Sequence, residues 1–309
     1  MIPNRPAGSS SSLFTLATTM VLLMAACVQA QVNTPAWKFE ADTEFDVVLT
    51  QSTKIKSQVD SRVKNVDNQL TLNLNWKVNE VSDEGTATIE MTIASIQMRM
   101  QSMPNGVGKS IDIDTSSEAK KKGTEADLLK QLNPLVGAIV VIEISPRGEI
   151  TKTEVPKDTL AALRNAPVSM KLRTILESDG IKDLFGQSAI VFPSDLTEGK
   201  PWSTKNDLET GFGKFVATHT IEWTGNRNSG DNEIAQFKLS SSIDAVDERG
   251  PNEPKLVDFS GGGEFVFDVT EGHAVSSKSS NEMKTEQPYR EKTIVTTVTT
   301  VVEMQINKK

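Results

Sequence analysis

Apolar and polar residues alternate along much of the chain, a pattern that predicts β-strands with one buried face. The clearest run is Leu70–Val78, in which Leu, Trp and Val side chains take every second position and Thr, Asn and Lys lie between them. The residues Asp83 to Gly85 predict a turn, and a second alternating run follows it. We therefore expect a long hairpin over Gln69–Met100.

The phase of the second run changes once. Ala87, Ile89 and Ile93 share one face, and the apolar series then resumes at Ile96 instead of at residue 95. A β-bulge inserts one extra residue into a strand and bends it. We therefore expect a bulge and a bent second arm in this hairpin.

Other segments give strand signals of differing strength. The stretch 51–67 is polar, and its alternation is too weak to assign. The run Ala138–Ser145 is continuously apolar and β-branched apart from Glu143, which predicts a buried strand. Polar clusters at 224–231 and 247–253 predict a turn and a loop. The remaining expected strands are Trp37–Thr50, Glu149–Val155, Phe215–Trp223, Ile234–Val246, Phe265–Val269 with a polar strand through Lys278, and Thr293–Ile306.

Helical spacing of apolar residues is confined to the middle of the chain. It predicts helices over Glu125–Leu132, which Pro134 ends, over Asp158–Asn165 and over Val168–Ser178. Strands, then helices, then strands indicate an α+β fold dominated by β structure. We expect long antiparallel strands that form a curved sheet or a half-open barrel. The expected divisions of this single domain, 31–309, are 31–120, 121–205 and 206–309.

The first thirty residues have the pattern of a bacterial secretion signal. Arg5 precedes an apolar run from Leu13 to Val28, and the small residue Ala30 ends a site that signal peptidase accepts. We expect cleavage after residue 30 and a periplasmic or extracellular protein. The alternative is a lipoprotein, because small residues before Cys27 resemble a lipobox; lipidation of Cys27 would anchor the chain to a membrane.

Composition narrows the class of protein further. Cys27 is the only cysteine, so the mature chain has no disulfide, thiolate metal site or cysteine nucleophile. The net charge of −8 becomes −9 once Arg5 is removed with the signal. An acidic chain gains nothing from phosphate contacts, so we expect no nucleic-acid partner. We also expect no cofactor.

Two histidines are the candidates for proton transfer near neutral pH. His219 lies inside an expected strand, where a residue on one sheet face is the simpler interpretation. His273 follows Glu271-Gly272, and we expect it to be solvated at a hairpin turn. No Gly-x-Ser-x-Gly motif supports a catalytic triad. We assign no catalytic residue, and an exported hydrolase that uses His219 or His273 is the alternative.

Metal and nucleophile motifs are equally sparse. Two histidines cannot form a three-histidine zinc site, and no His-Glu-x-x-His motif is present. Asp112, Asp114 and Glu118 offer spaced oxygens of the kind calcium prefers. However, alternating Ile and Asp is more typical of a strand with a solvated face, so we assign no metal ligand. The Ser-x-x-Lys match at Ser117 and Lys120 lacks its companion motifs.

Three segments carry a resemblance to a known family. They are Val141–Ile150, with its strand, turn glycine and returning strand; Phe192–Trp202, with a proline followed by Gly-x-x-Trp; and Gly263–Gly272, a late hairpin. These segments resemble an uncharacterised family of exported bacterial proteins, a domain of unknown function found in planctomycete-like and Bacteroidetes-like bacteria. The resemblance implies export and a β-rich fold, and it brings no catalytic residues.

These observations predict a non-catalytic envelope or secreted protein. Its curved sheet would bind a hydrophobic ligand or the surface of an envelope protein. Methionines such as Met91, Met98 and Met100 suit an adaptable apolar surface, although core filling is their commoner role. The remaining alternative is a structural or interaction module of a cell-surface assembly.

Overall fold

The fold of the chain comes from a computed structural model that describes residues 33–104, 108–119, 121–165, 190–210, 213–245 and 254–309. Residues Asn33–Lys309 form one compact unit. Its strands, which confirm the expected β-dominated class, are β1 Glu44–Val59, β2 Arg62–Val81, β3 Ala87–Pro104, β4 Lys109–Asp114, β5 Ile139–Ile144, β6 Ile150–Glu154, β7 Trp202–Thr210, β8 Gly213–Ser229, β9 Asn232–Ala245, β10 Lys255–Asp268, β11 His273–Tyr289 and β12 Lys292–Lys308.

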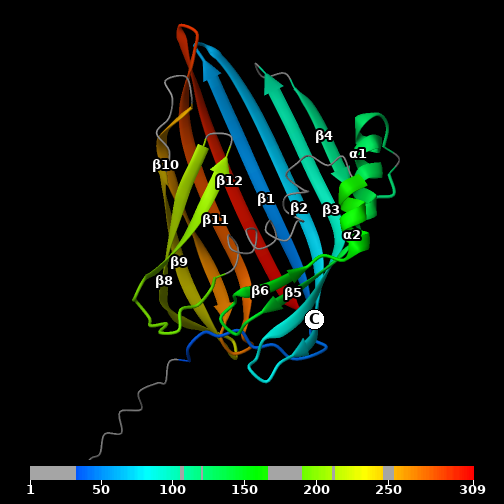
Figure 1. Cartoon of the computed structure of the whole chain (residues 1–309), viewed down its shortest axis with the longest axis vertical. Coiled ribbons are helices and arrows are strands. Elements are labelled where there is room, and N and C mark those ends of the chain that lie inside the picture. Colours follow the sequence, from blue (N-terminus) through cyan, green and yellow to red (C-terminus); the bar gives the residue numbers. More distant parts are fainter. Residues whose placement is uncertain (1–32, 105–107, 120, 166–189, 211–212, 246–253) are drawn as a thin grey trace, which may run out of the picture. The chain divides into compact units, whose positions relative to one another are not determined.

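All these strands belong to one antiparallel sheet. Its order is β6-β5-β3-β2-β1-β12-β11-β10-β9-β8-β7, and β4 pairs with the second half of β3. The first and last long strands, β1 and β12, lie side by side in the middle (blue and red in Figure 1). The sheet is curved and stays open, because β6 and β7 are its two edges.

The long hairpin and its bulge are confirmed. Strands β2 and β3 pair along their length, with Leu74 opposite Ile93 and Asn73 opposite Ser95. Ala94 is therefore the extra residue on β3, at the point where the apolar phase changes. The turn before β3 is also confirmed, because Gly85 has a φ of 82°, which favours glycine.

Several strand boundaries differ from the expectation. The stretch 37–43 precedes β1 instead of belonging to it. Strands β1 and β2 run through the unassigned segment 51–67, and β8 continues through the expected turn at 224–231 as far as Ser229. The strands extend this far because two-residue turns, with positive φ at Asp60, Gly230 and Arg290, connect them. Pairing on both sides satisfies the backbone of these strands whatever their side-chain polarity.

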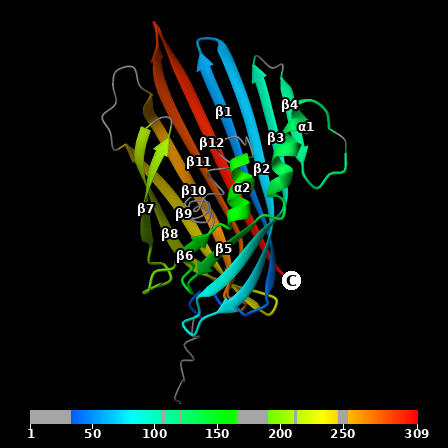
Figure 2. The same cartoon turned by 45° about the vertical axis from the view of Figure 1, so that its right-hand side comes forward.

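The central segment matches the expectation in part. Helix α1 spans Thr124–Leu132, a 3-10 turn over Asn133–Leu135 follows it, and α2 spans Lys157–Asn165. The expected helix 168–178 and loop 247–253 lie outside the described residues. Strand β5 has alternating burial and is not buried on both faces, and β7 carries no clear apolar pattern and was not predicted. Figure 1 shows both helices next to β3 and β4, and Figure 2 again shows α1 beside β4.

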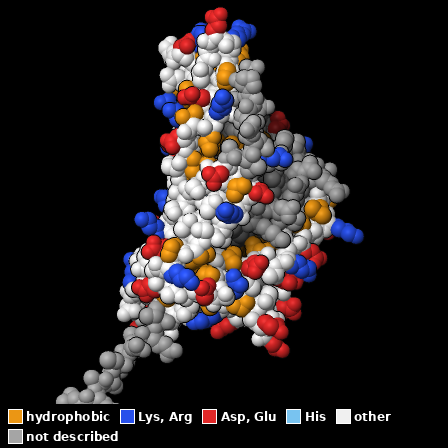
Figure 3. All heavy atoms as spheres, turned by 60° about the vertical axis from the view of Figure 1, so that its left-hand side comes forward, with side chains coloured by type: hydrophobic (Ala, Val, Ile, Leu, Met, Phe, Trp, Pro, Cys, Tyr) orange, Lys and Arg blue, Asp and Glu red, His pale blue; other side chains and the backbone are white. Residues whose placement is uncertain are grey.

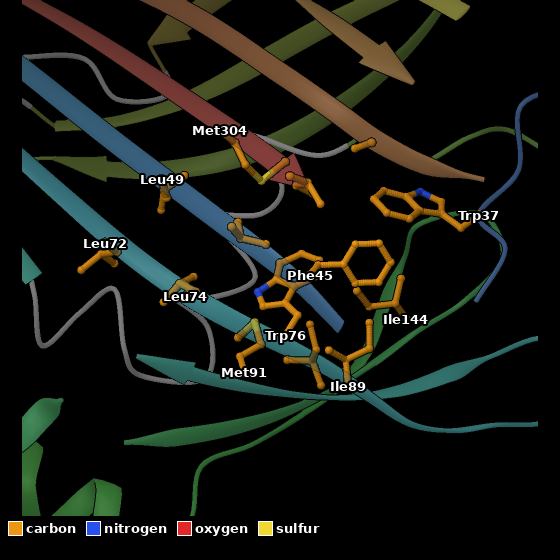
Figure 4. Packing of buried hydrophobic residues seen from close by; sticks show 14 of the residues in the cluster. Trp37, Phe45, Leu49, Leu72, Leu74, Trp76, Ile89, Met91, Ile144 and Met304 are labelled. Atoms are coloured by element: carbon orange, nitrogen blue, oxygen red, sulfur yellow. The ribbon is translucent and has the colours of Figure 1, made fainter. Parts of the chain in front are cut away.

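One face of the sheet, here called the inner face, carries the hydrophobic core. Figure 4 shows Phe45, Leu74, Trp76 and Met91 meeting there from β1, β2 and β3. Aromatic side chains of β8 to β10 continue this core, and Phe237 packs against Phe265 with ring centroids 5.8 Å apart. Burying one such side chain stabilises the fold by roughly 1.5–3 kcal/mol.

The segment before β1 closes one end of this core. The Trp37 amide donates a hydrogen bond to the Pro146 carbonyl, and the Lys38 amide donates one to the Gly272 carbonyl, both at 2.8 Å. The Trp37 ring packs edge-on against Phe267. The segment thereby joins the β5–β6 turn to the β10–β11 turn, which lie on opposite wings of the sheet.

Candidate functional site

A row of polar side chains crosses the inner face just beyond the core. Residues directly opposite each other on neighbouring strands point to the same face, so the pairing registers define the row. We call it the polar row; from β7 to β2 it comprises Thr204, His219, Ser241, Gly261, Asn281, Thr300, Thr53 and Asn68.

A second row, of apolar side chains, lies two residues further along the same face. It crosses β10, β11, β12, β1 and β2, and each member is partly exposed to solvent. None of its members belongs to the hydrophobic core cluster. We call it the upper apolar row, and it comprises Phe259, Met283, Val298, Ile55 and Val66.

A pocket of about 140 Å³ opens on the inner face where the polar row crosses β7 to β11. Its apolar lining comprises Ile190, Val191, Ile221 and Leu239. Its polar lining comprises Thr204, Asn206, His219, Ser241, Ser279 and Asn281. No Asp, Glu, Lys or Arg is among the described residues that line it, so the pocket offers hydrogen bonds without a formal positive or negative charge.

His219 is held within this pocket by its neighbour on the next strand. Its Nδ1 lies 2.8 Å from the Ser241 Oγ, within hydrogen-bond distance. Partial burial lowers the pKa of His219 below its ordinary value, since desolvation disfavours the charged imidazolium. The ring is therefore neutral at pH 7, and its second nitrogen can serve as a further donor or acceptor.

Asn281 faces the same space. Its Oδ1 is buried and has no hydrogen-bond partner among the described residues. The side chain lies across Gly261, because a Cβ at Gly261 would lie 2.3 Å from Asn281 Oδ1. That Cβ would also lie 2.9 Å from the Ser241 Cβ and 3.2 Å from the Phe259 ring. The glycine thus provides the room in which the polar row and the upper apolar row meet.

The second histidine is not where the sequence predicted it. His273 is only 8% exposed, so the expectation of a solvated turn residue is wrong. It begins β11, and its ring lies 5.5 Å from Phe45 in the core. Burial is the main cause that lowers the pKa of His273, although Asp268 opposes this effect. It lines none of the described pockets.

The acidic residues with calcium-like spacing lie on a strand edge and the turn beyond it. Asp112 is on β4 and forms an exposed ion pair with Arg99 at 3.1 Å. Asp114 accepts hydrogen bonds from the amide and hydroxyl of Ser116. Within the described ranges, no three His, Cys, Asp or Glu side chains are grouped to hold a metal ion. Lys120 of the Ser-x-x-Lys match lies outside the described residues.

Charged residues surround an open depression at the tips of the β1–β2 and β11–β12 hairpins. A wide, open depression there is lined by Arg62, Lys64, Arg290 and Lys292 together with Asp60 and Glu291. Lys292 pairs with Asp60 across the two hairpins. In Figure 3, side chains of both signs are interspersed over the face shown, with hydrophobic side chains between them.

The sequence predicted His219 on one face of a strand and a strand over Ile234–Val246, which contains Ser241, but it did not bring the two residues together. It missed Asn281 and the role of Gly261 entirely. The alternation Ser279, Asn281, Met283 shows that these residues share a face. Only the register with β10 and β12 places that face over Gly261 and beside the pocket.

No protein-family model matches the chain, and no curated protein matches it. Solved structures that match the chain include one described as "lipid-protein interactions in lipovitellin", at 8% identity and a TM-score of 0.46 over 87% of this chain. The match covers only 25% of that lipovitellin chain, so this chain spans about a quarter of its length.

Two further structures give weaker matches. An outer membrane channel from Pseudomonas putida F1 matches at 6% identity and a TM-score of 0.21, over 88% of this chain and 97% of that one. OccK5 from Pseudomonas aeruginosa matches at 8% identity and a TM-score of 0.20, over 86% and 98%. TM-scores below 0.5 define neither a family nor a function. The fold and the pocket together define the class: an open, curved antiparallel sheet with an amphipathic inner face.

Among the described helices, none has the length and apolar character needed to cross a bilayer.

Proposed function

We propose that this chain is an exported, non-catalytic envelope or secreted protein that binds a lipid-like ligand on the inner face of its sheet. The observation that carries the proposal is the upper apolar row. Its side chains are partly exposed, lie outside the core and follow one another across neighbouring strands. Scattered apolar side chains on a surface need no explanation, but a contiguous apolar strip marks a binding surface.

A lipid-like ligand fits this strip better than a second protein. The strip lies on the inner face of a curved sheet and adjoins a pocket of about 140 Å³. Small-molecule sites are concave and mostly apolar, with a few placed polar groups. The opposite face of the same strands is polar, with exposed Lys54 and Lys56 on β1.

The test uses the exported chain and N-phenyl-1-naphthylamine, an uncharged fluorescent probe of apolar sites. We expect fluorescence enhancement with the unmodified chain and its loss in Val298→Glu, which places a charge in the upper apolar row. Thr297→Glu is the matched control, because Thr297 lies on the opposite face, between Lys56 and Lys284. Equal binding by both variants would overturn the proposed site.

Bound molecules should also be identified directly. We expect organic-solvent extraction of the chain, purified from its native host, to release a hydrophobic compound that mass spectrometry detects. Absence of any hydrophobe, together with recovery of a stable protein partner in pull-downs from envelope extracts, would favour the structural or interaction module instead.

Location is part of the same proposal. We expect the mature N-terminus to be Gln31, which intact-mass analysis of the purified protein would show. A lipidated Cys27 at the N-terminus would instead make the protein a membrane-anchored lipoprotein. Export is expected under either outcome, because both processing sites follow the same secretion-signal pattern.

A hydrolase remains the second candidate, because Ser241 Oγ lies 2.8 Å from His219 Nδ1 within a pocket. In that reaction Ser241 would attack an ester carbonyl and pass its proton to His219, which would protonate the departing alcohol; water would then release the acid. No carboxylate lines the described pocket to orient the imidazole. Hydrolysis of p-nitrophenyl esters that disappears in Ser241→Ala would establish this candidate.

A further inference from the structure

The few polar groups in the pocket specify the chemistry of the ligand more narrowly than the upper apolar row does. Asn281 Oδ1 is a buried acceptor without a partner among the described residues. A buried acceptor left unsatisfied costs about 1–3 kcal/mol, so a ligand that donates a hydrogen bond to it recovers that free energy. An apolar ligand group at this position recovers nothing.

The residues that line the pocket also disfavour a ligand with a charged head group. An ionised carboxylate or phosphate would lose its hydration in this pocket without meeting a cationic side chain among the described lining residues. A ligand ammonium would find no carboxylate there either. The polar groups that do face the space are three hydroxyls, the amides of Asn206 and Asn281, and an imidazole that burial keeps neutral at pH 7.

The volume limits how much of the ligand enters. A cavity of about 150 Å³ accommodates a molecule the size of benzene, so a pocket of about 140 Å³ takes a small head group and the first few methylene groups. Phe259 of the upper apolar row lies close to Gly261, the neighbour of the lining residues Ser241 and Asn281, because its ring lies 3.2 Å from where a Cβ at Gly261 would be. An alkyl tail leaving the pocket there would continue along the upper apolar row.

We infer that the pocket holds the head of an uncharged lipid-like ligand, whose hydroxyl or amide N–H donates a hydrogen bond to Asn281 Oδ1 while its tail lies on the upper apolar row. This inference rests on the proposed function, since it requires a ligand on the inner face. It adds the class of head group and the residue that recognises it.

The test compares three ligands with matched tails: 1-decanol, decyl methyl ether and decanoate. Each displaces N-phenyl-1-naphthylamine from the exported chain at pH 7.5. We expect 1-decanol to bind about tenfold more tightly than the ether, which lacks a donor, and also more tightly than decanoate, which carries a charge. Asn281→Leu, which has a similar size, should bind decanol and the ether equally. Ser280→Ala, on the opposite face of β11, is the control and should keep the preference.

The outcomes separate the inference from the proposed function. Equal binding of decanol and the ether by the unmodified chain would overturn the inference, and this comparison needs no variant to fold. Tighter binding of decanoate would also overturn it, in favour of an anionic head group. If the probe itself fails to bind the unmodified chain, the proposed function fails and the inference fails with it.

Discussion

Trp37 packs directly over Gly148, which joins the segment before β1 to the β5–β6 turn. A Cβ at Gly148 would lie 2.4 Å from Trp37 Nε1 and 2.6 Å from the Ile190 carbonyl oxygen. The backbone at Gly148 has a φ of 85°, which other residues rarely adopt. One residue therefore combines a required backbone conformation with a close approach that closes the end of the core.

Gly148→Ala should destabilise the protein by about 2–4 kcal/mol, because strain at positive φ adds to overpacking against Trp37. Gly137→Ala is the matched control: its φ is 82°, and nothing lies within 4 Å of a Cβ there. We expect the control to lose only about 1 kcal/mol. Urea unfolding measures both, and equal losses would show that the contact with Trp37 contributes nothing.

Gly261→Ala should cost about 1–3 kcal/mol by overpacking and should weaken ligand binding, since the new methyl group would displace Asn281. The double variant Gly261→Ala with Asn281→Ala should recover part of the lost stability, because the closest clashing atom is gone. A double-mutant cycle in urea checks this coupling. Strictly additive effects would mean that Gly261 and Asn281 do not compete for the same space.

Stability should fall as the pH decreases below the ordinary histidine pKa of 6.5. Burial lowers the pKa of both His219 and His273 below the ordinary value of 6.5. The unfolded chain therefore binds protons first, so the free energy of unfolding is highest above pH 6.5 and decreases as the pH falls through the folded-state pKa values. His219→Gln and His273→Gln should each flatten this dependence in urea titrations at several pH values, and an unchanged slope in both would contradict the assignment.

The β1–β2 turn should depend on backbone conformation more than on charge. Asp60 has a φ of 53° and pairs with Lys292 in an exposed ion pair. Asp60→Ala should lower stability by about 1 kcal/mol, whereas Asp60→Asn should have little effect, because Asn tolerates the left-handed region. Thermal or urea unfolding distinguishes the two, and equal losses would assign the stabilisation to the ion pair.

Much of the sheet could be predicted from local patterns. The β2–β3 hairpin follows from strict alternation and a turn glycine, and its bulge follows from one phase change. Strands with little apolar character were missed or shortened. Strand β7, residues 51–59 of β1 and residues 224–229 of β8 are mostly polar, so local sequence gives little sign that their neighbours complete the backbone pairing.

The candidate site depends even more on tertiary contacts that local sequence does not predict. His273 was expected in solvent because it follows a turn glycine, but packing against Phe45 buries it. Asn281 has no local feature that distinguishes it from other polar strand residues. Its importance arises from Gly261, twenty residues earlier, which lies opposite it and leaves room for its side chain.

By itself, the sequence determined the β-dominated class, the face that each well-patterned strand buries and the absence of cysteine from residues 31–309, because these depend on composition and on the two-residue period of a strand. It also supplied the prediction of export. Only the tertiary structure decided the strand order, the pairing of β1 with β12 and the meeting of His219, Ser241 and Asn281 at one pocket. These depend on the registers between strands, and a register is a relation between distant segments that neither segment encodes alone.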